Sequence, residues 1–212
     1  MIILLHSMWC GDIMKVFLQD FIRDNIKMIS ILTLCMVIGL IVGIFMYQMI
    51  SPGVRSELIN SMKSTLDLSK QEGFEGINII RNGMISNLIL VLIIYLMSLT
   101  LISPYLISIL SLFKGLAIGI YIPTLLQIFG PSKGVLAIFL LVIIPNLVYI
   151  PSYLFLCTNS IRFHLSLIGD ENKFTVLMKE SFKIMLGFSI MFVGVILEQL
   201  TSFWIIALYH SI

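Results

Sequence analysis

One long stretch of this sequence is almost free of charge, and it limits the folds that the chain can adopt. Within residues 82–161 only Lys114 and Lys133 are charged, and no acidic residue occurs between Glu75 and Asp170. A soluble domain could not bury such a run, because its outer faces require polar side chains. One membrane crossing takes about 20 apolar residues, so the stretch predicts about three crossings. Backbone groups in lipid must bond internally, and these crossings are therefore predicted helices.

The composition extends this conclusion to the whole chain. Its 212 residues are 59% hydrophobic and 11% charged, with a mean hydropathy of +1.08. These values are typical of a polytopic membrane protein with little soluble mass. The net charge of +2 is too small to indicate nucleic-acid binding. Three cysteines cannot form a disulfide framework, and Cys35 and Cys157 lie in apolar stretches, where packing is their expected role.

Polar breaks divide the apolar sequence into five predicted spans, at residues 28–50, 84–103, 105–129, 134–160 and 184–208. The predicted fold class is all-α: a polytopic transmembrane helical bundle that forms one integral membrane domain over residues 1–212. The boundary between the second and third spans stays open. A break near Pro104 buries Lys114, whereas a break near Lys114 shortens the third span. Lysine side chains reach toward membrane surfaces, so we expect the Lys114 ammonium at a span boundary.

Two polar segments flank the first span. Residues 1–27 predict a cytoplasmic amphipathic N-terminus, which lies in the membrane interface or in solvent. Residues 1–13 lack the basic start of a signal peptide, and translation from Met14 is an open alternative. Residues 51–83 predict an extracytoplasmic segment with an amphipathic helix over about 54–71. Its apolar stripe packs against the protein's own loops, the membrane or a partner, and consists of Leu58, Met62 and Leu66.

The distribution of basic residues indicates the orientation, because cytoplasmic loops carry an excess of lysine and arginine. With the N-terminus in the cytoplasm, the cytoplasmic side holds eight basic residues, with Lys114 counted among them, and the opposite side holds five. This bias predicts that residues 51–83 and the C-terminus lie outside the cytoplasm.

Motifs of the common enzyme classes are absent from the sequence. There is no GxxxxGK[ST] phosphate loop and no HExxH zinc motif, and no GxSxG nucleophile elbow. The central spans lack the paired carboxylates of acid–base chemistry. We therefore predict a protein that is not an enzyme, with no catalytic residues, no cofactor and no metal.

The candidate residues for partner binding or packing lie mostly inside the spans. Two GxxxG pairs, Gly39 with Gly43 and Gly115 with Gly119, allow another helix to approach closely. Prolines in the fourth span remove helix donors and predict a kinked or partly unwound helix; the positions are Pro145, Asn146 and Pro151. Two ionisable residues complete the set: Lys114 as a boundary anchor or functional cation, and Glu198 as a buried network residue or a headgroup residue.

Four stretches together resemble the stage II sporulation protein M family of endospore-forming bacteria. They are Asn87, Phe113–Gly119, Ile144–Pro151, and Glu198 followed by Thr201. The resemblance covers most of the chain from Met14 onward. The chain departs from the family pattern after Glu198, where Gln199 and Ser202 stand instead of alanine and proline, which puts any role of those residues in doubt.

The resemblance implies a function that composition does not. It implies a non-enzymatic membrane scaffold that recruits peptidoglycan hydrolases, the stage II sporulation D and P proteins, at the septum. The location would be the mother cell side of the septum and engulfing membrane, with the lipid bilayer as the other partner. The alternative is a membrane transport component, a permease or channel subunit, in which the kinked fourth span and Glu198 line a path.

Overall fold

The structure is a computed structural model that describes residues 2–71, 76–100, 102–169 and 184–194, together with positions 178, 182, 196, 197 and 201. These residues are helical apart from short turns, so the predicted all-α fold class is confirmed for them. The elements are α1 (Ile2–Met49), α2 (Pro52–Gln71), α3 (Gly76–Ser98), α4 (Ser103–Ile138), the π-helical turn η1 (Phe139–Ile143) and α5 (Ile144–Gly169). A short apolar helix follows at Ile184–Gly194.

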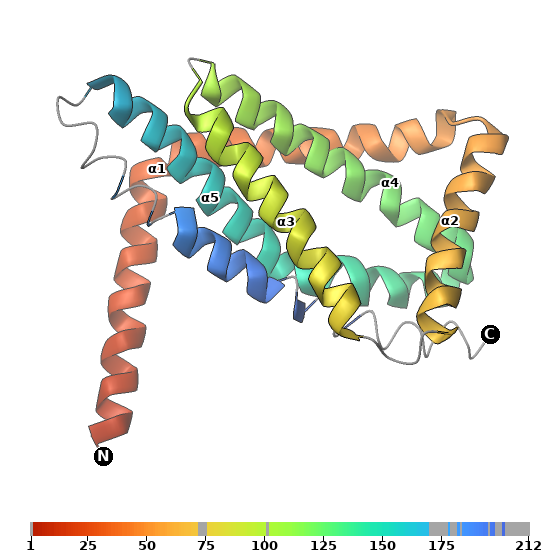
Figure 1. Cartoon of the computed structure of the whole chain (residues 1–212), viewed down its shortest axis with the longest axis horizontal. Helices are drawn as coiled ribbons and strands as arrows, with labels where there is room; N and C mark the ends of the chain where they lie inside the picture. Colours follow the sequence, from red (N-terminus) through yellow and green to blue (C-terminus); the bar gives the residue numbers. More distant parts are fainter. Residues whose placement is uncertain are drawn as a thin grey trace.

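Among the described residues, two helical stretches are long and apolar enough to cross a membrane, Gln19–Met49 and Ser103–Ser166. The second has 64 residues and would extend about 95 Å if it were straight, about three times the thickness of a bilayer's hydrocarbon core. It folds back at Gly130, where φ is 74° and ψ is 172°, a conformation that is essentially restricted to glycine. The break predicted between the spans 105–129 and 134–160 is thus confirmed, and the part of α4 before Gly130 runs opposite to α5 (Figure 1).

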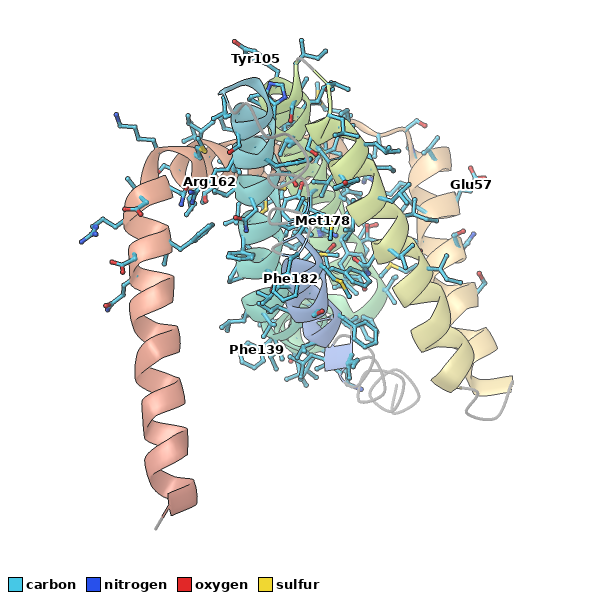
Figure 2. The ribbon with its side chains drawn as sticks, turned by 60° about the vertical axis from the view of Figure 1, so that its left-hand side comes forward. Glu57, Tyr105, Phe139, Arg162, Met178 and Phe182 are labelled. Atoms are coloured by element: carbon cyan, nitrogen blue, oxygen red, sulfur yellow. The ribbon has the colours of Figure 1, made fainter. Side chains whose placement is uncertain are left out.

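Two helical segments lie across the ends of the bundle. The N-terminal part of α1 makes a steep angle with the rest of that helix, and α2 lies across the opposite end (Figures 1 and 2). Near the bend in α1, Phe21 packs on Phe155 of α5, with ring centroids 4.7 Å apart. The buried Asn25 donates a hydrogen bond to the Phe21 carbonyl over 2.7 Å. The Phe21–Phe155 contact attaches α1 to α5 near the bend, while the Asn25 hydrogen bond lies within α1.

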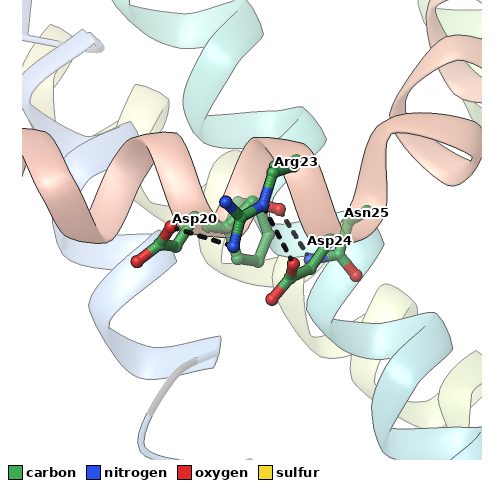
Figure 3. A network of polar contacts seen from close by, with 5 residues as sticks. Asp20, Arg23, Asp24 and Asn25 are labelled. Carbon is green, nitrogen blue, oxygen red and sulfur yellow. Dashed lines mark hydrogen bonds and ion pairs between the residues drawn. The ribbon is translucent and has the colours of Figure 1, made fainter.

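The opposite face of this α1 segment carries charges in solvent. Arg23 lies 3.4 Å from a carboxylate oxygen of Asp20 and 3.8 Å from one of Asp24 (Figure 3). All three side chains are more than half exposed, so these ion pairs contribute little to stability. The charges make this face of α1 polar, which agrees with the predicted amphipathic helix.

The outer surface of the bundle is apolar. Large side chains such as Phe45, Leu92 and Leu147 are half or more exposed, with 70% for Leu147. A water-soluble protein rarely exposes so continuous an apolar surface, whereas lipid tails solvate it well. Together with the two long apolar helices, this surface supports a membrane location.

Glycines let α1 and α4 touch backbone to backbone. A Cβ atom added to any of the four GxxxG glycines would overlap the carbonyl oxygen of the residue three positions before a glycine of the other helix. A Cβ on Gly43 would also lie 3.0 Å from the Cα of Gly119. The pairs therefore form one crossing between helices that run in the same direction: Gly39, Gly43, Gly115 and Gly119.

Helix α5 lies in the centre of the bundle, and residues 156–161 are buried on all sides. Its neighbours each contribute one fully buried apolar side chain to the same core: Leu32 from α1, Ile94 from α3 and Ile107 from α4. The helix at Ile184–Gly194 packs on α5 through two glycines, since a Cβ on Gly194 would lie 3.2 Å from the Tyr149 backbone nitrogen. A second, smaller core lies near α2 and consists of Leu125, Phe129, Ala137 and Val142.

Candidate functional site

A cavity with polar lining residues lies between α4, η1 and the start of α5. Its volume is about 290 Å³, and Lys114 is part of its wall. Lys114 follows the start of α4 at Ser103 by 11 residues and precedes the bend at Gly130 by 16. At about 1.5 Å per residue, it lies near the middle of this arm. The lining residues are Lys114, Ala117, Ile118, Tyr121, Leu141, Val142, Pro145, Asn146 and Tyr149.

The position of Lys114 differs from the sequence prediction. We expected its ammonium at a span boundary, but α3 ends at Ser98 and α4 begins at Ser103, which is the partition that places Lys114 within a helix. The Nζ atom lies 4.3 Å from the centroid of the Tyr149 ring. A cation over an aromatic face gains about 0.5–2 kcal/mol, which helps to hold the half-buried Lys114 side chain against α5.

Tyr149 is held by contacts on both sides. It is 5% exposed, and its hydroxyl donates a 2.8 Å hydrogen bond to Oδ1 of Asn87 on α3. Its ring is parallel to that of Tyr153 within 10°, with centroids 6.5 Å apart. The Asn87–Tyr149–Lys114 chain therefore connects α3, α5 and α4 through side chains that are far apart in sequence.

Pro145 explains the π-helical turn beside the cavity. A proline has no N–H to donate and its ring collides with the preceding turn, and one additional residue per turn in η1 relieves that collision. π-helical turns inside helices are frequent at functional sites. Asn146 donates a 2.7 Å hydrogen bond to the Val142 carbonyl, which satisfies an acceptor near the disrupted turn. The fourth predicted span is thus a continuous helix with a π-helical turn, and it is not unwound.

A second structured region fixes the corner between α1 and α2. Nη2 of Arg55 donates to the carbonyl oxygens of Tyr47 and Gln48 over 3.0 and 3.1 Å, which satisfies carbonyls at the end of α1 that have no partner within the helix. The guanidinium also lies 5.0 Å from the Tyr47 ring centroid. The Tyr47 hydroxyl donates to Oε1 of Gln127 on α4 over 2.7 Å. These residues, which the sequence analysis missed, attach α2 to the end of α1 and the end of α1 to α4.

The apolar stripe of α2 lies toward the protein itself. Met62 packs against the smaller core, and Leu58 is half-buried, while the side chain of Leu66 lies outside the described residues. The structure therefore favours the alternative in which this helix packs on its own chain. The exposed stripe of α2 is polar, and it consists of Glu57, Asn60, Ser61 and Ser64; Figure 2 shows Glu57 on the outer side of α2.

Comparison with known protein families matches residues 32–198 to stage II sporulation protein M. The chain belongs to the stage II sporulation protein M family. No curated protein and no solved structure matches this chain. The match begins at Leu32 in α1 and contains the glycine crossing, the α2 corner and the Lys114 cavity. The suspected resemblance is therefore confirmed.

The structure brings many of the predicted residues of this family member into two groups. The four glycines form the α1–α4 crossing, and Lys114, Pro145 and Asn146 line the cavity next to it. Pro151 is exposed on α5 and lies outside the cavity lining. Glu198, where the family match ends, lies outside the described residues.

Polar residues in the middle of α5 were not predicted as candidates. Ser111 of α4 and Tyr153 of α5 lie 3.4 Å apart, oxygen to oxygen, and both are fully buried. Farther along α5, Thr158, Asn159 and Ser160 are at most 1% exposed. These residues are buried because other helices surround this part of α5. No local sequence pattern indicates that environment.

Proposed function

We propose that this protein is a non-enzymatic scaffold with five membrane spans that recruits peptidoglycan hydrolases during sporulation. Its partners would be the stage II sporulation D and P proteins, at the septum and engulfing membrane on the mother cell side. Family membership supports a sporulation role and a membrane location. The observation that carries the scaffold proposal is α2, which is fixed across one end of the bundle and exposes a polar stripe.

The direction of the helices supports the proposed topology. Because Gly39 and Gly43 meet Gly115 and Gly119 in the same order, α1 and α4 run in the same direction. If α1 leaves the cytoplasm, as the basic residues predict, α3 returns and α4 leaves again, and α2 would then lie outside the cytoplasm. In that arrangement α2 faces the compartment that contains peptidoglycan.

The polar stripe of α2 provides the test. Glu57→Arg combined with Asn60→Arg changes two exposed side chains one turn apart, which leaves the packing of Met62 intact. We expect normal membrane levels and at least a tenfold loss of hydrolase co-purification, since a few interface residues usually carry most of the binding energy. Asp20→Arg with Asp24→Arg is the matched control at the opposite end of the bundle. Equal co-purification in the two double mutants would refute α2 as the docking surface.

The cavity favours a second candidate function, a transport component. A cation, an amide and a π-helical turn beside Pro145 resemble the interrupted helices that form substrate sites in transporters. If transport were the function, Asn146→Leu would impair sporulation while the hydrolases still reached the septum. If the scaffold proposal is right, any sporulation defect of a variant will follow the loss of hydrolase localisation.

A further inference from the structure

We propose that an anionic phospholipid binds in the angle between α5 and the N-terminal part of α1, with its phosphate on Arg162. The site needs no partner protein, so it goes beyond the scaffold proposal and does not depend on it. Phe21 of α1 packs on Phe155 of α5 near the bend in α1. Arg162 follows Phe155 by seven residues, which is about two turns or 10 Å, and it therefore lies on the same side of α5. Figure 2 shows Arg162 beside that bend.

Arg162 carries a charge that the described part of the chain does not compensate. Its side chain is half-buried, and among the described residues no ion pair or hydrogen bond involves it. Asp20 and Asp24 of α1 pair with Arg23 instead (Figure 3). A guanidinium presents five N–H donors in a planar fork that matches phosphate oxygens. A phosphate on Arg162 would therefore supply the acceptors that its described surroundings lack.

Apolar side chains next to this cation suit the acyl chains of the same lipid. Ile22 and Ile26 lie one turn apart on α1, beside the face that holds Phe21, and they are 42% and 54% exposed. On α5, Leu165 follows Arg162 by three residues and is 48% exposed. An exposed apolar flank beside a cation, at the end of a membrane bundle, fits a molecule with both acyl chains and a charged headgroup.

The charge balance around the bend favours an anionic lipid over a zwitterionic one. Three described cations and two described carboxylates lie there, which leaves one net positive charge: Asp20, Arg23, Asp24, Lys27 and Arg162. A headgroup with one negative charge balances this excess, whereas the ammonium of a zwitterionic headgroup would be repelled by it. The basic residues predict that this end of the bundle is cytoplasmic, and the cytoplasmic leaflet is the one with a negative surface potential.

The test measures lipid affinity with the full chain purified in a nonionic detergent. A short-chain phosphatidylglycerol is titrated, and its binding is followed by the rise in melting midpoint that a ligand of the folded state causes. We expect Arg162→Gln to weaken this binding at least tenfold and Arg162→Lys to weaken it less, since lysine keeps the charge without the planar fork. Lys63→Gln is the matched control, because Lys63 is a half-buried cation of α2 at the opposite end of the bundle, and it should bind like wild type.

Two other ligands separate the lipid from related sources of phosphate. Phosphatidylcholine of the same chain length should bind at least tenfold more weakly, and inorganic phosphate should not compete. Ile22→Ser combined with Ile26→Ser should weaken binding of phosphatidylglycerol through the lost acyl-chain contacts. The proposal is overturned if Arg162→Gln binds phosphatidylglycerol like wild type, if Lys63→Gln loses as much affinity as Arg162→Gln, or if phosphatidylcholine or inorganic phosphate binds equally well. If Arg162→Gln fails to fold, the comparison of ligands on the wild-type chain decides alone.

Discussion

Replacing Gly39 by alanine should separate α1 from α4. The added Cβ would overlap the Leu112 carbonyl oxygen, whereas ordinary van der Waals contact begins near 3.4 Å. Because the obstacle is backbone, a side-chain rotation cannot relieve it and the helices must move apart. Overpacking of this kind costs about 1–3 kcal/mol. In an exposed helix the same substitution would stabilise by about 1 kcal/mol, so the structure predicts the opposite sign at Gly39.

Gly53 is the matched control, since nothing lies within 4 Å of a Cβ added there. The assay is thermal unfolding in detergent, followed with a thiol-reactive dye that reports exposure of the buried Cys157. We expect Gly39→Ala to lower the midpoint by about 4–8 °C for a cost near 2 kcal/mol. We expect Gly53→Ala to change it little or raise it.

Gly115→Ala adds a test of symmetry. Its Cβ would overlap the Met36 carbonyl oxygen on the other side of the same crossing, so the single variant should cost as much as Gly39→Ala. Once one alanine has separated the helices, the second adds less, and the double variant should fall short of the sum by about 1 kcal/mol. The close crossing is refuted if Gly39→Ala melts like Gly53→Ala, or if the two glycines add independently.

Three further predictions follow from the bends and the topology. Gly130→Ala should cost about 1–3 kcal/mol although nothing lies within 4 Å of the added Cβ, because φ is 74° there; unchanged melting relative to Gly53→Ala would contradict it. Arg55→Met should cost about 1–2 kcal/mol by removing the charged hydrogen bonds to the end of α1, and Arg55→Lys should recover part of the loss; equal melting of all three proteins would contradict the clamp. In a cysteine-free background, Ser64→Cys and Ser211→Cys should react with an impermeant thiol reagent on whole cells and Asn172→Cys should not; labelling of Asn172→Cys alone would reverse the orientation.

Local patterns were sufficient to predict several elements. The apolar residues spaced four apart near Met62 indicated α2, and the structure places that helix at Pro52–Gln71. The Gly130–Pro131 pair indicated the bend in Ser103–Ser166, because a proline cannot continue the helix before it and a glycine accepts the unusual φ. Both predictions depend only on residues that are close together in the sequence, so they could be made without knowledge of the fold.

The turn between α3 and α4 shows how precise local patterns are. Its residues 99–102 are mostly apolar and contain no glycine or proline, and the break was predicted from Pro104, which follows the turn at the start of α4. The turn is closed by its own backbone instead: Thr100 donates to the Met97 carbonyl over 3.0 Å, and Ser103 donates to the Thr100 carbonyl over 3.2 Å. The structure thus selects the predicted partition with a break near Pro104, which places Lys114 within α4.

Long-range contacts were beyond sequence reasoning for a different reason. A GxxxG pair indicates that a helix can be approached, but it does not identify which helix approaches it. Likewise, Tyr47 and Gln127 are 80 residues apart, and neither has a neighbour in sequence that suggests the hydrogen bond. Only the folded chain shows that the glycine pairs meet each other.

The glycine crossing and the cavity are physically coupled, because Gly115 and Lys114 are adjacent on α4. The glycines hold α4 against α1 on one side. The neighbouring side chain of Lys114 is then directed at Tyr149 of α5 on another side. A change in the separation of α1 and α4 would therefore move the ammonium relative to the Tyr149 ring. For this reason the glycine variants should disturb the Lys114–Tyr149 contact, even at temperatures where the protein stays folded. The two regions then act as one unit, in which close helix packing sets the position of the Lys114 ammonium.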